Sequence, residues 1–265
     1  MKTSTAAGWV PVETKGTVAA SDVAYARTRF EGLSRYARDP VLSARARLTH
    51  LNDRALARPA VVEVNIDLNG RLVRAQVARP TMHEAIDEAR NRLRDRLQRA
   101  AGDWEAIRGG RPSHEVHEWR HDSQPTDRPP YFPRPAEERQ VIRHKAFSLA
   151  RTTADDAAEE MSLLDFNFLL FTEAGSGVDS LLYRTDDGSR YRLAQVTPAP
   201  GRVRRGDLPV TISEQPAPHL TLQEATDRLN VSGWPFVFFQ DATTHRGCVL
   251  YHRYDGHYGL ITPVE

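Results

Sequence analysis

The chain contains 265 residues, of which 40% are apolar and 27% are charged, and its formal net charge is +1. These values are typical of a soluble globular protein, and the length allows one to three domains. The single cysteine, Cys248, excludes an intramolecular disulfide, and no run approaches the ~20 apolar residues of a membrane span. We therefore expect a cytoplasmic protein without a membrane segment.

Two segments rich in proline, glycine and arginine divide the chain. Residues 104–137 contain six prolines and no apolar period, which predicts a semi-stiff linker. A shorter break of similar composition follows residue 197. The predicted organisation is an N-terminal domain at 9–103, a linker at 104–137, and two C-terminal repeats at 138–197 and 207–265.

Charge is distributed unevenly between these parts. Residues 1–103 contain 18 Lys and Arg against 12 Asp and Glu, a net charge of +6, whereas residues 104–265 have a net charge of −5. Arginine makes up 33 of the 36 basic residues and suits bidentate contacts with phosphate. The asymmetry indicates a basic domain that faces nucleic acid beside a near-neutral or acidic module.

The N-terminal domain begins with a predicted strand, helix and second strand. A short strand falls within residues 10–18, and Ser21 is placed to cap a helix that ends at Asp39-Pro40. The apolar residues of this helix follow the helical period and are Val23, Ala26, Phe30, Leu33 and Ala37. Residues 42–48 alternate between apolar and polar, which predicts a strand with Leu42 on its buried face and with Arg45 and Arg47 on its exposed face.

A β-hairpin follows, because Asn69-Gly70 is the preferred two-residue type I′ turn and lies between two alternating runs. This turn pairs Leu68 with Arg71 and sets the register of both strands. The remaining buried pairs are then Ile66 with Val73, Val64 with Ala75, and Val62 with Val77. On the outer face Arg74 lies opposite Asn65 and joins Arg45 and Arg47.

Thr81 starts a second helix whose two flanks carry arginines. Its apolar stripe consists of Met82, Ile86, Ala89, Leu93, Leu97 and Ala100. One flank of the stripe carries Arg92, Arg96 and Arg99, and the other carries Arg90 and Arg94. The predicted topology is β-α-β-β-β-α, with both helices on one sheet face and the other face free. A solvated helix edge is the alternative explanation for the arginines.

These residues resemble a known family. The element order, the Asn-Gly hairpin and the run Met82-His83-Glu84-Ala85-Ile86-Asp87, followed by Arg92 and Arg99, are similar to the N-terminal domain of ribosome hibernation promoting factors. The resemblance implies a fold similar to a double-stranded-RNA-binding domain. It also implies binding in the small-subunit channel where mRNA and tRNA would lie, and inhibition by occupation rather than by chemistry.

The C-terminal half matches itself at an offset of 68 residues. The matched positions include Phe166 with Trp234, Phe168 with Phe236, Phe171 with Phe239, Tyr183 with Tyr251, and Asp187-Gly188 with Asp255-Gly256. Each copy predicts a strand, a short helix that starts at Thr153 or Thr221, and two or three further strands. The predicted fold class is α+β, with two tandem small β-rich α+β domains after the N-terminal domain.

The second copy extends the resemblance to long-form hibernation factors. The run Tyr251-His252-Arg253-Tyr254-Asp255-Gly256-His257-Tyr258-Gly259-Leu260-Ile261 is similar to the signature of their C-terminal domain, whereas the first copy has Arg192 where the family usually has glycine. The usual long form carries one such domain, which self-associates and holds two ribosomes together. This chain carries two.

The strands at 166–171 and 234–239 are apolar on both faces, which a module of about 60 residues rarely buries alone. The candidate association residues are Phe166, Phe168, Phe171, Trp234, Phe236 and Phe239. We expect the two copies to pair within one chain as a pseudo-dimer, so that the factor holds single ribosomes. The alternatives are two separate modules, or pairing with a second chain.

Several residues are of types that bind metals or phosphates or act in catalysis, but their sequence context does not support such a role. The linker histidines His114, His117 and His121 lack the spacing of a metal motif, and Gly175-Ser176-Gly177 fits a hairpin better than a phosphate loop. Cys248 fits a strand core, and Asp87 a helix surface or cap. We expect no enzyme activity, cofactor, metal site or small-molecule substrate.

The sequence thus predicts a ribosome-binding translation inhibitor that acts under stress or dormancy. Its proposed contacts with small-subunit rRNA are Arg45, Arg47, Arg74, Arg90, Arg92, Arg94, Arg96 and Arg99. Replacing Arg92, Arg96 and Arg99 together is expected to abolish binding without unfolding the domain. The alternative function is a regulatory adaptor whose C-terminal domains bind a protein such as a transcription factor.

Overall fold

The computed structural model describes residues 10–52, 56–109, 134–185, 190–253 and 255–264. These residues form two compact units. The first contains the described residues up to 109 together with the segment Ser162–Asp165, and the second contains the remaining described residues. No helix in these ranges is both long enough and apolar enough to cross a membrane.

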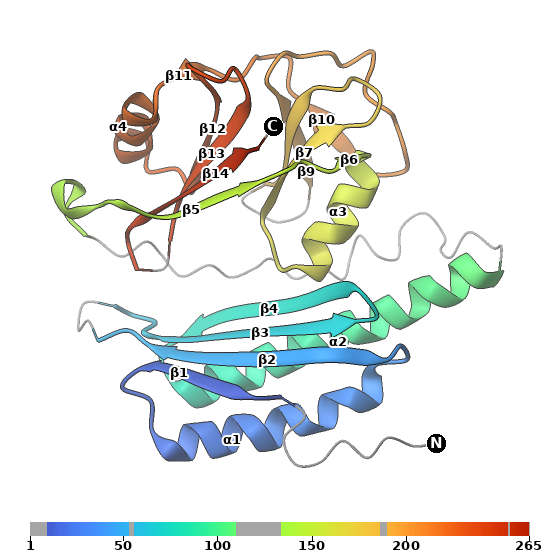
Figure 1. Cartoon of the computed structure of the whole chain (residues 1–265), viewed down its shortest axis with the longest axis vertical. Coiled ribbons are helices and arrows are strands. Elements are labelled where there is room, and N and C mark those ends of the chain that lie inside the picture. The colour runs from blue at the N-terminus through green and yellow to red at the C-terminus, as the bar shows by residue number, and fades with distance from the viewer. Residues whose placement is uncertain (1–9, 53–55, 110–133, 186–189, 254, 265) are drawn as a thin grey trace. The chain divides into compact units, whose positions relative to one another are not determined.

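The first unit contains a four-stranded sheet and two long helices (Figure 1). Its elements are β1 (Val12–Gly16), α1 (Ala20–Glu31), the 3₁₀ helix η1 (Gly32–Tyr36), β2 (Val41–His50), β3 (Ala60–Leu68), β4 (Arg71–Arg79) and α2 (Met82–Gly109). The strand order is β1-β2-β3-β4, with β1 parallel to β2 and the other pairs antiparallel. This confirms the predicted β-α-β-β-β-α topology.

The hairpin between β3 and β4 has the predicted register. Leu68 pairs with Arg71 and Val62 with Val77, and the turn residues Asn69 and Gly70 both have positive φ, as a type I′ turn requires. The alternation therefore places one set of side chains in the core and the other set on the opposite face.

One apolar core joins the sheet to both helices. Phe30 of α1, Leu33 of η1 and Leu93 of α2 are fully buried against inward side chains of β2, β3 and β4. A polar contact also ties the helices together, because Asp87 of α2 accepts hydrogen bonds from the Tyr25 hydroxyl (3.0 Å) and Arg29 Nε (2.7 Å) of α1. Both helices cover the same sheet face, as predicted.

The structure differs from three local predictions. Ser21 does not cap α1, which is preceded by Ala19 without a side-chain cap. Leu42 is 62% exposed rather than buried, because the β2–β3 register shifts between Val41 and Ser43 and reverses the side-chain alternation there. Helix α2 extends past residue 103 to Gly109, into the segment predicted to be linker.

The second unit contains two five-stranded sheets, each with a short helix. The elements that lead into and form repeat one are η3 (Ala136–Glu138), β5 (Val141–Phe147), β6 (Arg151–Thr152), α3 (Ala154–Leu163), β7 (Phe168–Glu173), β8 (Asp179–Arg184) and β9 (Tyr191–Gln195). Those of repeat two are β10 (Val210–Ile212), β11 (His219–Leu220), α4 (Leu222–Ser232), β12 (Phe236–Asp241), β13 (Gly247–His252) and β14 (Tyr258–Pro263).

The first strand of each repeat joins the sheet of the other repeat. The two sheets have the orders β10-β9-β8-β7-β6 and β11-β12-β13-β14-β5. Strand β5 pairs parallel to β14, and β10 pairs parallel to β9. The two repeats thus exchange their leading strands, which the sequence repeat did not predict.

The helix starts and one hairpin of this unit follow the sequence signals. Thr221 and Glu224 form a reciprocal capping box at α4, and the Thr153 hydroxyl accepts a hydrogen bond from the backbone of Asp156 in α3. The β7–β8 turn contains Gly177 at φ +70°, which confirms the hairpin predicted for Gly175-Ser176-Gly177. Asp187-Gly188 lies outside the described residues.

A further apolar cluster contains side chains from both repeats. Phe168, Leu170 and Leu181 of repeat one are buried with Val249 of repeat two, and Phe236, Phe238 and Tyr251 pack against them. The opposite face of β12 contributes Val237 and Phe239 to a separate core under α4. Both faces of this strand are therefore covered.

Candidate nucleic-acid interface

The N-terminal sheet carries two exposed arginines on β2, on the face opposite its helices. Arg45 and Arg47 lie two residues apart on one face, and Glu13 of the neighbouring β1 contacts both, at 2.6 Å from Arg45 Nη2 and 3.2 Å from Arg47 Nη2. The hydrogen bond from Arg45 lowers the pKa of Glu13, and the same bond raises the pKa of Arg45. Both shifts favour the ionised forms of Glu13 and Arg45.

Arg74 of β4 lies on the same sheet face as Arg45 and Arg47, but its side chain is less accessible than predicted. The register places Arg45 beside Asn65 and Asn65 beside Arg74. The Arg74 side chain is only 14% exposed, donates a 2.8 Å hydrogen bond to Gln76 Oε1, and lies 3.3 Å from a Glu63 carboxylate oxygen. Its guanidinium is thus already held by neighbours on the sheet.

Three arginines of α2 remain partly exposed and make only local contacts. Arg90 Nη1 lies 3.4 Å from Asn91 Oδ1, Arg94 Nη2 lies 2.8 Å from Asp95 Oδ1, and Arg99 Nε lies 3.3 Å from the Asp95 carbonyl oxygen. Contacts of this kind between exposed neighbours are weak and easily exchanged for a phosphate.

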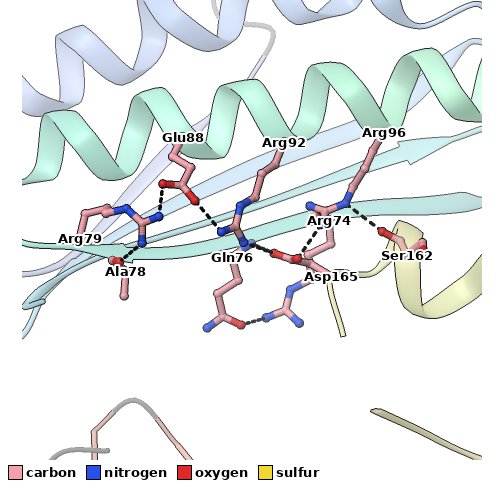
Figure 2. Close-up of polar contacts among 9 residues, drawn as sticks. All are labelled: Arg74, Gln76, Ala78, Arg79, Glu88, Arg92, Arg96, Ser162 and Asp165. Carbon is pink, nitrogen blue, oxygen red and sulfur yellow. Dashed lines mark hydrogen bonds and ion pairs between the residues drawn. The ribbon is translucent and has the colours of Figure 1, made fainter. Parts of the chain in front are cut away.

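Arg96 is buried, in contrast to its predicted place on an exposed helix flank. Its Nη2 donates a 2.5 Å hydrogen bond to Asp165 Oδ1, its Nε donates to the Ser162 carbonyl (2.8 Å), and its Nη1 donates to the Arg74 carbonyl (2.9 Å) (Figure 2). The Arg96 side chain is 10% exposed and that of Asp165 is fully buried.

Asp165 is the centre of this cluster. Its second oxygen accepts a 2.8 Å hydrogen bond from the Gln76 backbone and lies 3.5 Å from Arg92 Nη1. Burial acts to raise the pKa of Asp165, but the charges of Arg96 and Arg92 outweigh it and hold the pKa below its usual range. Arg92 is also paired with Glu88, which in turn pairs with Arg79 (Figure 2).

The eight predicted arginines therefore fall into two groups. Arg74, Arg92 and Arg96 have mostly buried side chains that already make ionic or hydrogen-bond contacts. The other five are partly or fully exposed on the sheet and on α2, and they are Arg45, Arg47, Arg90, Arg94 and Arg99. Replacing Arg96 is consequently not a clean test of RNA binding, because it would leave Asp165 buried without its main partner.

Sequence reasoning missed the acidic partners in this unit. Glu13 precedes Arg45 by 32 residues and Asp165 follows Arg96 by 69 residues, so no helical or strand period connects them.

The six candidate association residues also separate into groups. Phe168 and Phe236 contact each other with tilted rings whose centroids are 4.9 Å apart, in the cluster shared by the two repeats. Phe239 packs inside its own repeat, and Phe171 is likewise buried, at 1% exposure. Phe166 is partly exposed near Lys145, and Trp234 is 51% exposed beside Arg228.

Of the remaining chemical candidates, Cys248 occupies a structural position. Cys248 is buried in β13, where desolvation raises the pKa of its thiol to about 12. Among the described residues, no three His, Cys, Asp or Glu side chains group in a way that could hold a metal ion. His114, His117 and His121 lie outside the described residues.

Comparisons with known proteins cover the N-terminal domain and both repeats. The family model described as "Sigma 54 modulation protein / S30EA ribosomal protein" matches residues 17–103. The model of the "Sigma 54 modulation/S30EA ribosomal protein C terminus" matches twice, at 136–193 and at 210–260. The second match confirms the internal repeat.

Two curated relatives are similar over much of this chain. A protein named "Dormancy associated translation inhibitor" from Mycobacterium tuberculosis is 34% identical over 227 residues, which cover 83% of this chain and 76% of the relative. A "Ribosome hibernation promotion factor" from Deinococcus radiodurans is 28% identical over 173 residues, which cover 62% of this chain and 86% of the relative.

Among solved structures, the N-terminal domain of Protein Y from Thermus thermophilus is 22% identical and covers 34% of this chain and 97% of its own, with a TM-score of 0.29. The family models and the long relative agree with the resemblance found in the sequence. The chain belongs to the Sigma 54 modulation/S30EA ribosomal protein family, as a long form with a repeated C-terminal domain.

Proposed function

We propose that this protein inhibits translation by binding the small ribosomal subunit and keeping ribosomes inactive under stress or dormancy. The observation that carries the proposal is the similarity, over 83% of the chain, to a relative named for dormancy and translation inhibition. A second relative is named for ribosome hibernation. The adaptor hypothesis is not favoured, because both relatives are named for translation or ribosomes.

The exposed arginines supply the chemistry that rRNA binding needs. Arg45 and Arg47 project from a rigid strand, and Glu13 holds both guanidinium groups on one face. Phosphate recognition of this kind requires positive charge in a fixed arrangement and no base-specific code. An RNA phosphate at this position competes with Glu13 for the two guanidinium groups.

The C-terminal pair supports a second, finer part of the proposal, in which the repeats satisfy each other within one chain. The aromatic cluster shared by the two repeats covers the strand faces that would otherwise be free to join a second chain. The exchange of β5 and β10 between the sheets adds backbone hydrogen bonds to this contact. A chain paired in this way would hold single ribosomes rather than ribosome pairs.

The rRNA contact is tested by removing two charges from the sheet face. The variant Arg45→Gln/Arg47→Gln should bind small subunits more weakly, and the log–log salt slope should fall by about 0.7–0.9 for each arginine–phosphate pair that the variant removes. The matched control is Arg202→Gln/Arg205→Gln, which removes the same charge from exposed positions of the second unit. Equal binding and equal slopes for the two variants would refute the assignment.

A further inference from the structure

The contact between the repeats has an approximate two-fold symmetry. Residues 68 positions apart are equivalent, so Phe168 corresponds to Phe236 and Tyr183 to Tyr251. The Phe168–Tyr251 ring centroids are 5.7 Å apart, and the equivalent Phe236–Tyr183 centroids are 5.5 Å apart. A contact that is symmetric in this sense would suit a pair of identical repeats as well as a pair of different ones.

The symmetry breaks at two adjacent pairs of equivalent positions. Asp179 of repeat one corresponds to Gly247 of repeat two, and Val178 corresponds to Arg246. Asp179 Oδ2 accepts hydrogen bonds from Arg246 Nε (2.7 Å) and from the Gly247 backbone (3.0 Å). The Asp179 side chain is only 10% exposed, whereas that of Arg246 is 37% exposed, so the carboxylate is buried while the guanidinium still reaches water.

Gly247 is required by the same contact. A Cβ atom built at Gly247 would lie 2.9 Å from the Asp179 Cβ and 3.1 Å from a Val196 methyl group, both of repeat one. Two copies of repeat one would therefore bring two Asp179 side chains together, with overlapping atoms, like charges and no arginine. Two copies of repeat two would face each other with Arg246 on both sides and no carboxylate.

We propose that Asp179, Arg246 and Gly247 form a specificity lock that directs repeat one to pair with repeat two and rejects like-with-like pairing. This inference rests on the pairing in the proposed function and adds the residues that select the partner. Attraction between unlike repeats and repulsion between like ones together give such discrimination. Because both repeats share one chain, their high effective concentration makes the intrachain pair the favoured product.

The test redirects pairing with two full-length variants. The Asp179→Arg chain has arginine at both position 179 and position 246, so both positions are cationic. The Arg246→Asp chain has aspartate at both positions, so both are anionic. Each variant alone should lose its intrachain lock, whereas an equimolar mixture can restore two complementary pairs between chains. Light scattering and native mass spectrometry should show a mixed dimer of twice the 29.8 kDa chain mass. Neither variant alone, nor the wild type, should form a dimer.

Two controls make the result specific. The double variant Asp179→Arg/Arg246→Asp restores opposite charges within one chain and should remain monomeric. Asp227→Arg reverses an exposed carboxylate on α4, outside the contact, and should give no mixed dimer with Arg246→Asp. A mixture that contains only monomers, while the double variant is folded, would overturn the lock.

A second measurement covers the case in which Asp179→Arg does not fold. Hydrogen exchange of the β7 and β13 amides is compared in Asp179→Asn, Arg246→Gln and the combined variant, and the lock predicts a coupling of about fivefold in exchange rate. If the effects of the two single variants on the exchange rate simply add in the combined variant, the proposed lock is refuted. A wild-type chain that dimerises would instead refute intrachain pairing, which is a separate failure from loss of the coupling.

Discussion

Removing the Phe168 ring tests whether the two repeats share a core in solution. Phe168 is 7% exposed and contacts Phe236 and Tyr251, both of repeat two. Truncation of a buried Phe to Ala typically costs about 3–5 kcal/mol, because buried apolar surface is removed and a cavity remains. At 1.4 kcal/mol per factor of ten, we expect Phe168→Ala to raise the local opening constant by at least about 100-fold.

Hydrogen exchange resolves this effect by strand. In Phe168→Ala, amides of β12 and β13 should lose protection together with those of β7, because the deleted ring contacts the other repeat. The matched control is Trp234→Ala, in which a 51% exposed aromatic is removed at a cost of less than about 1 kcal/mol. Loss of protection confined to β7, β8 and β9 would refute the shared core.

Three further predictions concern charged groups. Glu13→Gln should tighten binding to small subunits at low salt, because it removes the carboxylate that competes for Arg45 and Arg47; unchanged or weaker binding would contradict the competition. Asp165→Ala should lower the free energy of unfolding of the first unit by about 3–5 kcal/mol in denaturant titrations, because Arg96 stays buried without its carboxylate, whereas Arg90→Ala should change it by less than about 1 kcal/mol. Burial lowers the pKa of His252 from 6.5 to about 4, so the unfolded state binds a proton first as pH falls; stability of the second unit should be full above pH 6.5 and drop by about 3 kcal/mol by pH 4. His252→Phe should remove this loss, and an unchanged pH profile would show that another group causes it.

Local sequence signals predicted the elements well wherever a short-range rule controls the structure. Asn69-Gly70 fixed the β3–β4 register because its turn type permits only one pairing, and Thr81 and Thr221 marked helix starts through their capping geometry. The error at Leu42 arose because a register shift reverses the side-chain alternation and leaves no mark in the hydrophobic pattern.

Long-range pairing was beyond the reach of the sequence pattern. The apolar run in each repeat showed that both strand faces needed cover, but not that Phe168 and Phe236 would face the other repeat while Phe239 faces its own helix. Strand exchange depends on which sheet edge is free to accept the leading strand, and the hydrophobic period of a strand does not show which edge that is. The burial of Arg96 depends in the same way on Asp165, which lies 69 residues away.

We infer that one chain keeps one ribosome inactive, because its tandem repeats pair with each other rather than with a second chain. Sucrose-gradient sedimentation of purified ribosomes with the full-length protein tests this claim most directly. We predict that the protein migrates with the single-ribosome peak and leaves that peak at high salt, as contacts with phosphate require. A protein-dependent ribosome-dimer peak, or protein that stays at the top of the gradient at low salt, would contradict the account.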